Sequence, residues 1–200
     1  QVQNQSAPKL KDKTFPFTPP ISLVNKISLP IFNFAYFHKN ALKKRNQLVH
    51  YEPFFYPLDS IHAWNKMYGH LGFYQYQSVV PREVGLEATQ EMLKMIKKFG
   101  EGSFLAVLKT FGNHESGGLL SFPQPGVTLA LDFPNRGEST LNLFNELDHI
   151  VQEARGRLYL AKDARMPKTL FEAGYPRIQE FMKYRDPGIS SNMSRRLLGV

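Results

Sequence analysis

Residues 73–100 decide the fold, and their sequence is FYQYQSVVPREVGLEATQEMLKMIKKFG. Phe73–Val80 alternates and is rich in β-forming residues, which predicts a strand. Pro81 suits the first turn of a helix. An apolar stripe then predicts a helix that ends at Gly100. The residues of this stripe are Leu86, Met92, Leu93, Ile96 and Phe99.

A second set of elements follows along the chain. We expect strands over 103–111, 126–133 and 158–162, with a helix over 138–154 between the last two. The apolar side of that helix carries Leu141, Phe144, Leu147, Ile150 and Val151. The resulting order, β-α-β-β-α-β, predicts an α+β fold: a ferredoxin-like antiparallel sheet with two helices on one face. Short helices are expected around Leu170, over 178–184 and over 193–198, completing the C-terminal part.

The N-terminal quarter has a different character. Residues 1–20 are rich in Gln, Lys and Pro and predict an extended, irregular arm. Residues 21–37 are apolar, and we expect a loop or strand packed on a core, with contact to a membrane surface as the alternative. A strand is predicted over 49–56. A short helix, capped by Asp59 or Ser60, should end at Gly69.

Composition and charge narrow the class of protein. The 200 residues contain no cysteine, which excludes disulfides, thiolate metal sites and cysteine nucleophiles. The six histidines lack metal-ligand spacing, so no metal site is expected. No apolar run is long enough to span a bilayer, and no signal-peptide pattern is present. We therefore expect a cytoplasmic protein, with a peripheral position at the inner membrane as an option.

The net charge of +8 is concentrated at one end of the chain. Residues 1–50 carry eight Lys or Arg against one acid, Asp12, whereas residues 51–200 carry 17 against 16. The first quarter is thus at +7 and the rest at +1. Such a basic segment can meet anionic lipid, nucleic acid or an acidic protein surface, or it can be solvated.

The strand residues separate into two faces because side chains alternate along a strand. Gln75 and Gln77 share one face, and we place Lys109 on the same side. This face, here called the open face, also receives the following residues: Leu105, Val107, Phe111, Thr128, Ala130 and Asp132. The opposite set is apolar and should pack on the helices; it includes Phe104, Ala106, Leu108, Val127, Leu129, Leu131 and Phe133. Two amides, a lysine and a hydroxyl on an apolar floor indicate a ligand surface more than a solvated one.

Several strings of residues resemble one family. They are YQSVVP (76–81), FLAVLKTFG (104–112), LSFPQPG (120–126), LDFP (131–134) and GRLYLAKDAR (156–165). In order and spacing they are similar to the C-terminal half of the decaprenylphosphoryl-ribose oxidases, within the vanillyl-alcohol-oxidase class of FAD-linked oxidoreductases. The resemblance runs from about Phe54 to Leu198. It implies FAD as cofactor, whereas no Gly-rich phosphate-binding turn occurs in these 200 residues.

The resemblance also implies roles for individual residues. Lys162 matches a catalytic lysine at the flavin ring, where a cation stabilises the charge of the reduced ring. Tyr159 and Ala161 match flavin-side positions. The residues matching the substrate pocket are Gln75, Gln77, Lys109, Phe111, Thr128 and Phe55. Mycobacterial members have Asn, Cys and Tyr where this chain has Thr128, Ala130 and Phe55, so a lipid-linked pentose phosphate, a sugar alcohol and an aldonolactone all stay open as substrates.

The resemblance suggests a division of the chain. Residues 1–48 would be the basic arm, 49–156 the substrate domain, and 157–200 a C-terminal segment that completes the FAD domain of a longer protein. The predicted function is oxidation of a carbinol by hydride transfer to flavin, with the fragment alone inactive and a missing N-terminal FAD domain as its partner. The alternative is a non-catalytic ferredoxin-like module whose basic arm binds nucleic acid or an anionic membrane. Binding of bases would need exposed aromatic residues on the sheet, which the open face fits poorly.

Overall fold

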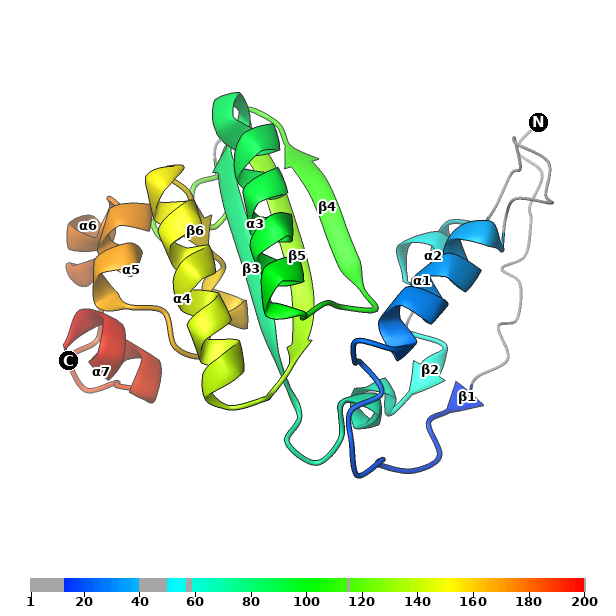
Figure 1. Cartoon of the computed structure of the whole chain (residues 1–200). Coiled ribbons are helices and arrows are strands. Elements are labelled where there is room, and N and C mark those ends of the chain that lie inside the picture. The colour runs from blue at the N-terminus through cyan, green and yellow to red at the C-terminus, as the bar shows by residue number, and fades with distance from the viewer. Residues whose placement is uncertain (1–12, 40–49, 57–58, 115, 200) are drawn as a thin grey trace, which may run out of the picture. The chain divides into compact units, whose positions relative to one another are not determined.

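Four strands in the C-terminal part of the chain form an antiparallel sheet (Figure 1). They are β3 (Phe73–Pro81), β4 (Ala106–Phe111), β5 (Gly126–Pro134) and β6 (Arg157–Leu158), in the spatial order β4-β5-β3-β6. Two helices, α3 (Gly85–Phe99) and α4 (Glu138–Glu153), connect them in the order β3-α3-β4-β5-α4-β6. The predicted α+β, ferredoxin-like order is therefore confirmed.

This computed structural model describes residues 13–39, 50–56, 59–114 and 116–199, with Pro53 and Phe54 as backbone only. The predictions for residues 1–12 and 40–49 lie outside the described residues. The chain divides into two units, residues 1–72 and residues 73–200. The division predicted at residues 48 and 156 stays a prediction about a longer protein.

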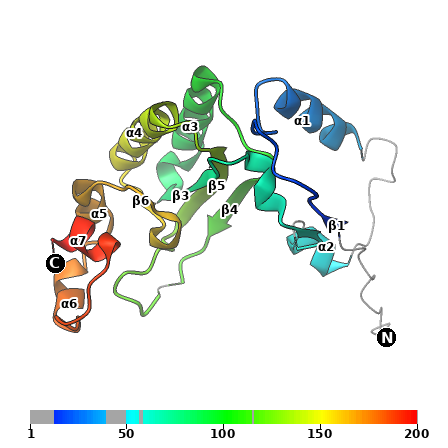
Figure 2. The same cartoon turned by 90° about the horizontal axis from the view of Figure 1, so that it is seen from below.

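Helices α3 and α4 lie side by side on one face of the sheet (Figure 2). The ring of Phe144 in α4 packs at 5.1 Å from that of Tyr76 and at 5.4 Å from that of Phe133, measured between centroids. Leu143, Leu147 and Val151 are fully buried around it. Because this core is made of one sheet face and two helix faces, the other sheet face is left to meet something else.

The ends of α3 follow the prediction, and its buried face follows it in part. The helix follows a short 3₁₀ turn after Pro81 and ends at Gly100, whose φ is +67°. Met92 and Ile96 of the predicted stripe are buried and Phe99 packs against the core, whereas Leu86 and Leu93 are exposed. Ala88, a small residue outside the predicted stripe, is buried instead.

Strand β4 lies at the edge of the sheet, and this corrects a second prediction. Leu108 was expected to pack on the helices with Phe104 and Ala106, but its side chain is 60% exposed and Ala106 is exposed too. The helices pack against β3, β5 and β6. The sequence shows which residues share a face of β4, but the position of β4 in the sheet is set by long-range pairing.

Two glycines lie against the last residues of β3. A Cβ atom on Gly126 would lie 2.0 Å from the carbonyl oxygen of Val80, and one on Gly156 would lie 2.5 Å from that of Val79. Both distances are far below van der Waals contact, so only glycine permits these close approaches. Gly126 pairs with Pro81 at the start of β5.

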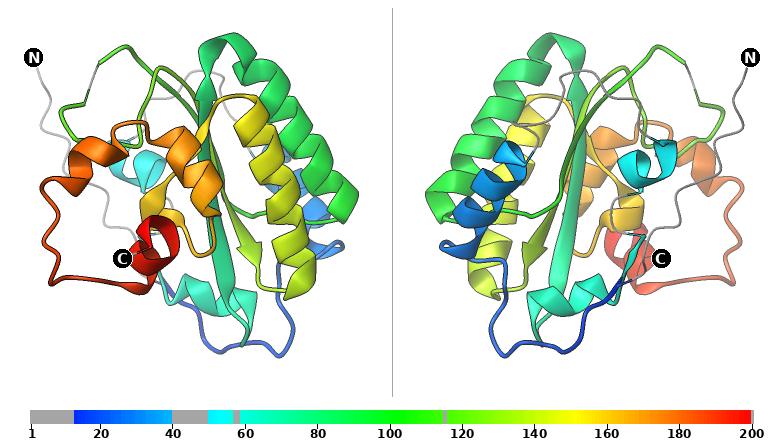
Figure 3. Two further views of the ribbon diagram at one scale, coloured as in Figure 1. Left: turned by 90° about the vertical axis from the view of Figure 1, so that its left-hand side faces the viewer. Right: turned by 90° about the vertical axis from the view of Figure 1, so that its right-hand side faces the viewer.

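The C-terminal segment leaves the sheet earlier than predicted. A strand was expected over 158–162, but the strand that pairs with β3 is Arg157–Leu158. A 3₁₀ turn, η3 (Leu160–Lys162), follows it. Three short helices come next, as predicted: α5 (Lys168–Gly174), α6 (Ile178–Met182) and α7 (Asn192–Leu198) (Figure 3). Their side chains Leu170, Phe171, Ile178 and Leu197 join the core of the same unit.

The described residues of the N-terminal unit form short helices and one pair of short strands. β1 (Lys13–Thr14) pairs in parallel with β2 (Ile61–His62), and a 3₁₀ helix η1 (Trp64–Tyr68) ends at Gly69 as expected. The predicted helix start near Asp59 is wrong, because Ile61–His62 is extended and Ala63 is left-handed, with φ +54°.

Two further predictions for this unit are wrong. The strand expected over 49–56 contains a helix, α2 (Tyr51–Phe55), which begins where the Glu52 amide donates to the His50 ring. Residues 21–37 were expected to be a loop or strand on a core, but they include a helix, α1 (Ser28–His38), with no buried residue. Aromatic residues favour strands only where a sheet exists to receive them. No helix in the described ranges is both long and apolar enough to cross a bilayer.

Candidate functional site

Polar side chains from neighbouring strands meet on the open face, opposite α3 and α4. The antiparallel register sets Gln75 beside Asp132 and Lys109 beside Thr128, so the predicted sharing of a face is confirmed. The Gln75 amide donates to Asp132 Oδ1 at 3.0 Å, and the Gln77 amide donates to Thr128 Oγ1 at 3.2 Å. These bonds hold both carboxamides down on the sheet.

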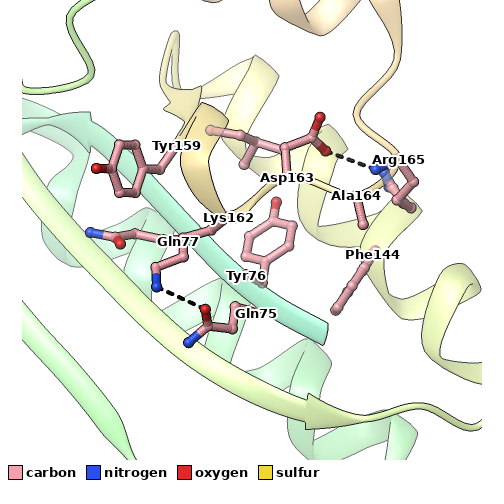
Figure 4. A pocket seen from close by; sticks show the side chains of 10 residues that line it. Gln75, Tyr76, Gln77, Phe144, Tyr159, Lys162, Asp163, Ala164 and Arg165 are labelled. Atoms are coloured by element: carbon pink, nitrogen blue, oxygen red, sulfur yellow. Dashed lines mark hydrogen bonds between the residues drawn. The ribbon is translucent and has the colours of Figure 1, made fainter. Parts of the chain in front are cut away.

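Lys162 reaches this row from the short turn that follows β6. The Tyr159 amide still donates to the Gln77 carbonyl oxygen, at 2.9 Å, after which η3 turns the chain across. The Lys162 ammonium then donates to Gln75 Oε1 at 2.8 Å (Figure 4). Lys162 was predicted at a strand end. Its position depends instead on the early end of β6.

The turn that carries Lys162 is braced by its neighbour Asp163. One carboxylate oxygen of Asp163 accepts from the backbone amides of Arg165 and Met166, at 2.8 and 2.6 Å. The other accepts from Arg196 in α7 at 2.7 Å. Because Asp163 is adjacent to Lys162 in sequence, the C-terminal helix helps to hold the ammonium group in place.

An aromatic row borders the polar groups. Phe122 stacks on Tyr159 with ring centroids 4.7 Å apart, and Phe111 meets Phe122 edge-on at 6.0 Å. Tyr159 and Phe111 were predicted as flavin-side and substrate-side residues. Phe122 was not, although it lies inside one of the strings that carried the resemblance and is buried between the two.

Asp132 is the main residue of this face to which the sequence analysis gave no role. Its side chain is buried, and Oδ2 has no hydrogen-bond partner within the described residues. Burial raises the pKa of the Asp132 carboxyl, while the hydrogen bond from Gln75 and the charge of Lys162 oppose the rise. An acid that alternates with Thr128 and Ala130 in an otherwise apolar strand was the available signal.

A second polar cluster is centred on Asp148 of α4, and two of its members, Tyr76 and Arg165, line the pocket of Figure 4. Asp148 accepts from the Tyr76 hydroxyl at 3.0 Å and from both terminal nitrogens of Arg165 at 2.6 and 2.7 Å. Burial raises the pKa of Asp148 to about 6. Burial also raises the pKa of Tyr76, and the Asp148 charge adds to that rise. This cluster ties α4 to β3 and to the segment after η3.

The remaining predicted residues are placed less tightly. Lys109 is exposed on the edge strand β4, and Ala161 is exposed on η3. Phe55 lies in α2 of the N-terminal unit, so its part in a pocket on the open face stays a prediction. The described ranges contain no cluster of His, Asp or Glu suited to a metal ion.

The arrangement suits recognition of a polar, electron-rich ligand. An ammonium group has three protons, and within the described residues Lys162 uses one of them on Gln75. The others can serve a carbonyl or an anion beside the aromatic row. Aromatic and apolar walls with a few fixed polar groups are typical of small-molecule sites.

Comparison with known proteins gives two informative relatives. No protein-family model matches the chain. It is 34% identical over 116 residues to an uncharacterized protein in the mprA 5′ region of Streptomyces coelicolor, which covers 56% of this chain and 31% of that protein. It is 39% identical over 189 residues to the decaprenylphosphoryl-beta-D-ribose oxidase of Mycolicibacterium smegmatis. That match covers 92% of this chain and 40% of the oxidase, so the chain spans about two fifths of this relative. The resemblance predicted from the sequence is thereby confirmed: over nearly its whole length, the chain is similar to part of a decaprenylphosphoryl-ribose oxidase.

Proposed function

We propose that this chain is the C-terminal, substrate-binding part of an FAD-dependent oxidoreductase that oxidises a carbinol in a sugar-type substrate. The observation that carries the proposal is the ammonium of Lys162, held at 2.8 Å from Gln75 on the open face. The identity of 39% to an oxidase across 92% of the chain supports it. Because the chain spans 40% of that relative, the activity proposed is that of a longer protein.

The residues present fit a flavin ring. An isoalloxazine has carbonyl and ring-nitrogen acceptors, and FAD supplies the acceptor of a hydride. A fixed cation beside such acceptors stabilises developing negative charge, and Lys162 is that cation here. Tyr159, whose ring stacks on Phe122, offers a flat apolar neighbour, and the exposed Ala161 leaves room on the turn.

The substrate would lie among the remaining groups of the open face. Gln77, held by the buried Thr128 hydroxyl, offers an amide for sugar hydroxyls, and Phe111 offers an apolar wall. Lys109 adds a cation whose charge favours an anionic group such as a phosphate. We therefore rank a lipid-linked pentose phosphate first, with a sugar alcohol or an aldonolactone as alternatives.

Spectroscopy of the whole protein tests this function. The whole protein should be purified yellow, with its flavin absorbance bleached under anaerobic conditions by one of the three substrate classes. Residues 1–200 alone should bind FAD weakly or not at all. A colourless whole protein that takes up no FAD, or a flavin that none of the three classes reduces, would overturn the proposal.

We further propose that the basic N-terminal part contacts anionic lipid, which gives a peripheral position at the inner membrane. Helix α1 has no buried residue, and Ile31, Phe34 and Phe37 are 65%, 67% and 80% exposed. No acid occurs from Lys13 to Tyr51. Exposed apolar side chains among unbalanced cations complement an anionic lipid surface, with aromatic residues at the headgroup level.

Vesicle flotation tests the lipid contact. The chain should float with vesicles of phosphatidylglycerol and phosphatidylcholine, and less with phosphatidylcholine alone. Phe34→Glu combined with Phe37→Glu should abolish flotation, while Ile189→Glu, at an exposed apolar residue of the C-terminal unit, should not. Equal flotation of the double variant would contradict the proposal, as would selective retention of RNA in place of lipid.

The alternative function, a nucleic-acid module, is less well supported by the geometry. Stacking of bases needs exposed aromatic rings on the sheet. On β3, β4 and β5 the aromatic side chains of the open face, Phe73 and Phe111, are at strand ends, and Phe111 meets the buried Phe122 edge-on. The rest of the face is the amide, hydroxyl and lysine network described above.

A further inference from the structure

The carboxamide of Gln75 is held at both ends by groups of opposite character. Its nitrogen donates to Asp132 Oδ1 at 3.0 Å, and its oxygen accepts from the Lys162 ammonium at 2.8 Å. An ionised carboxylate can only accept hydrogen bonds, and an ammonium can only donate them. Only one of the two orientations of the amide therefore satisfies both neighbours.

As a buried carboxylate, Asp132 lowers the stability of the folded state. Its side chain is only 4% exposed, and Oδ2 has no hydrogen-bond partner in the described part of the chain. A buried carboxylate with an unsatisfied oxygen opposes folding, whereas a neutral side chain of similar shape would not. The local backbone does not depend on this carboxylate, because the Asp132 amide donates to Ser103 Oγ at 3.2 Å. Buried charges that do not stabilise a fold are found most often at functional sites.

We propose that Asp132 is a positioning residue, which orients the Gln75 amide so that its carbonyl oxygen holds Lys162 on the open face. The use of Lys162 at a flavin rests on the proposed function. The positioning itself is a property of residues 73–200 and needs no cofactor. Asp132 hydrogen-bonds to Gln75 and not to Lys162, and its charge also attracts the Lys162 ammonium.

Substitution of Asp132 separates this role from plain packing. In Asp132→Asn the new carbonyl oxygen can still accept from Gln75, so the native orientation of Gln75 is kept. The reverse orientation would turn an NH₂ group toward the Lys162 ammonium, which sets two donors against each other. Asp132→Leu removes the acceptor altogether. Asp132→Leu should therefore release Lys162, whereas Asp132→Asn should retain it, and neither should weaken the fold, because the buried charge is gone.

Nuclear magnetic resonance on the 200-residue chain, labelled with ¹⁵N, tests the proposal. In the native chain the Lys162 ammonium should give a protected cross-peak, identified by its loss in Lys162→Arg. In Asp132→Leu its protons should exchange with water at least about tenfold faster, the size expected for loss of one charge-assisted hydrogen bond, and in Asp132→Asn the protection should be largely retained. The matched control is Thr128→Val, which removes the acceptor of Gln77 on the same face and should leave the Lys162 signal unchanged.

Each outcome either supports or overturns the proposal. Unchanged protection of Lys162 in Asp132→Leu would overturn the proposal, as would an equal loss of protection in Asp132→Asn and Asp132→Leu. A fall in unfolding midpoint in both variants would also overturn it, since it would make Asp132 a structural residue. Loss of protection together with a colourless whole protein would leave the positioning intact and reject the flavin function. A yellow whole protein whose flavin is reduced, together with unchanged protection of Lys162, would support the flavin function and reject the positioning.

Discussion

The two units of the chain treat their apolar residues in opposite ways. Among the described residues, 22 of the 24 buried hydrophobic side chains lie in residues 73–200, whereas 13 of the 19 exposed large ones lie in residues 1–72. The C-terminal unit has a core of its own and can hold a site on its outer sheet face. The N-terminal unit presents apolar and basic groups together. The C-terminal unit is thus held by its own core, whereas most large apolar side chains described in the N-terminal unit are exposed.

The largest expected effect comes from a pair of phenylalanines, one in each unit. Phe133 is 0% exposed and packs edge-on against Phe144, whereas Phe37 is 80% exposed. Phe133→Ala should lower the free energy of unfolding by about 3–5 kcal/mol, because it leaves a cavity in the core. Phe37→Ala should change it by less than about 0.5 kcal/mol. Urea unfolding followed by circular dichroism measures both, and equal losses would break the contrast between the units.

A pair of lysines sharpens the contrast at the level of function. In the whole protein Lys162→Ala should slow flavin reduction by about 10²–10³-fold, the usual effect of losing one fixed electrostatic donor. Lys26→Ala, in the N-terminal unit, should leave the rate unchanged. Stopped-flow absorbance under anaerobic conditions measures the rate. Native reduction kinetics in Lys162→Ala would remove this residue from the catalytic site.

A pair of tyrosines gives a smaller effect of the same kind. The buried Tyr76 hydroxyl donates to Asp148, while Tyr36 in α1 is 63% exposed. Tyr76→Phe removes a donor from a buried carboxylate and should cost about 1–3 kcal/mol of unfolding free energy. Tyr36→Phe should be neutral. If thermal unfolding shifts equally in both variants, the cluster around Asp148 does not stabilise α4 against β3.

The smallest expected effect is a pH dependence that arises in the C-terminal unit. Burial raises the pKa of Asp132 above its usual value of 3.8, so the folded state holds this proton more tightly than the unfolded chain does. Stability from this group is present below that usual value and is lost as the pH rises through the raised pKa. The advantage of Asp132→Asn over the native chain should therefore grow from about pH 3.5 to about pH 7. Unfolding free energies at the two values test this, and a constant difference would contradict it.

The sequence predicted the C-terminal unit well because its signals are local. Strict alternation marked Phe73–Val80, and Gly100 supplied the left-handed end of α3. Alternation also assigned Gln75, Gln77 and Thr128 to one face, which the antiparallel pairing then brought together. Where a residue's burial depends on distant parts of the chain, as for Leu108 on the edge strand, local pattern was not enough.

The site was predictable only in part, for a related reason. The polar row follows from alternation, but Lys162 was singled out by resemblance alone, since its position depends on where β6 ends. The role of Asp132 needed the burial of its carboxylate and the hydrogen bond to Gln75, which no local pattern contains. In the N-terminal unit, residues 49–56 predicted a strand, but Tyr51–Phe55 forms a helix, and the small sheet described in this unit contains only β1 and β2.

The two glycines beside the end of β3 bear on how this site could change over generations. Each lacks a side chain where the backbone of Val79 or Val80 comes within 2.0–2.5 Å of where a methyl group would be. A mutation that added one would have to push neighbouring strands apart or shift their pairing. Since a shift by a single position exchanges the inward and outward rows, Tyr74 and Tyr76 would then replace the carboxamides outside. The side chains of the open face can therefore change to suit new ligands only as long as Gly126 and Gly156 stay glycine.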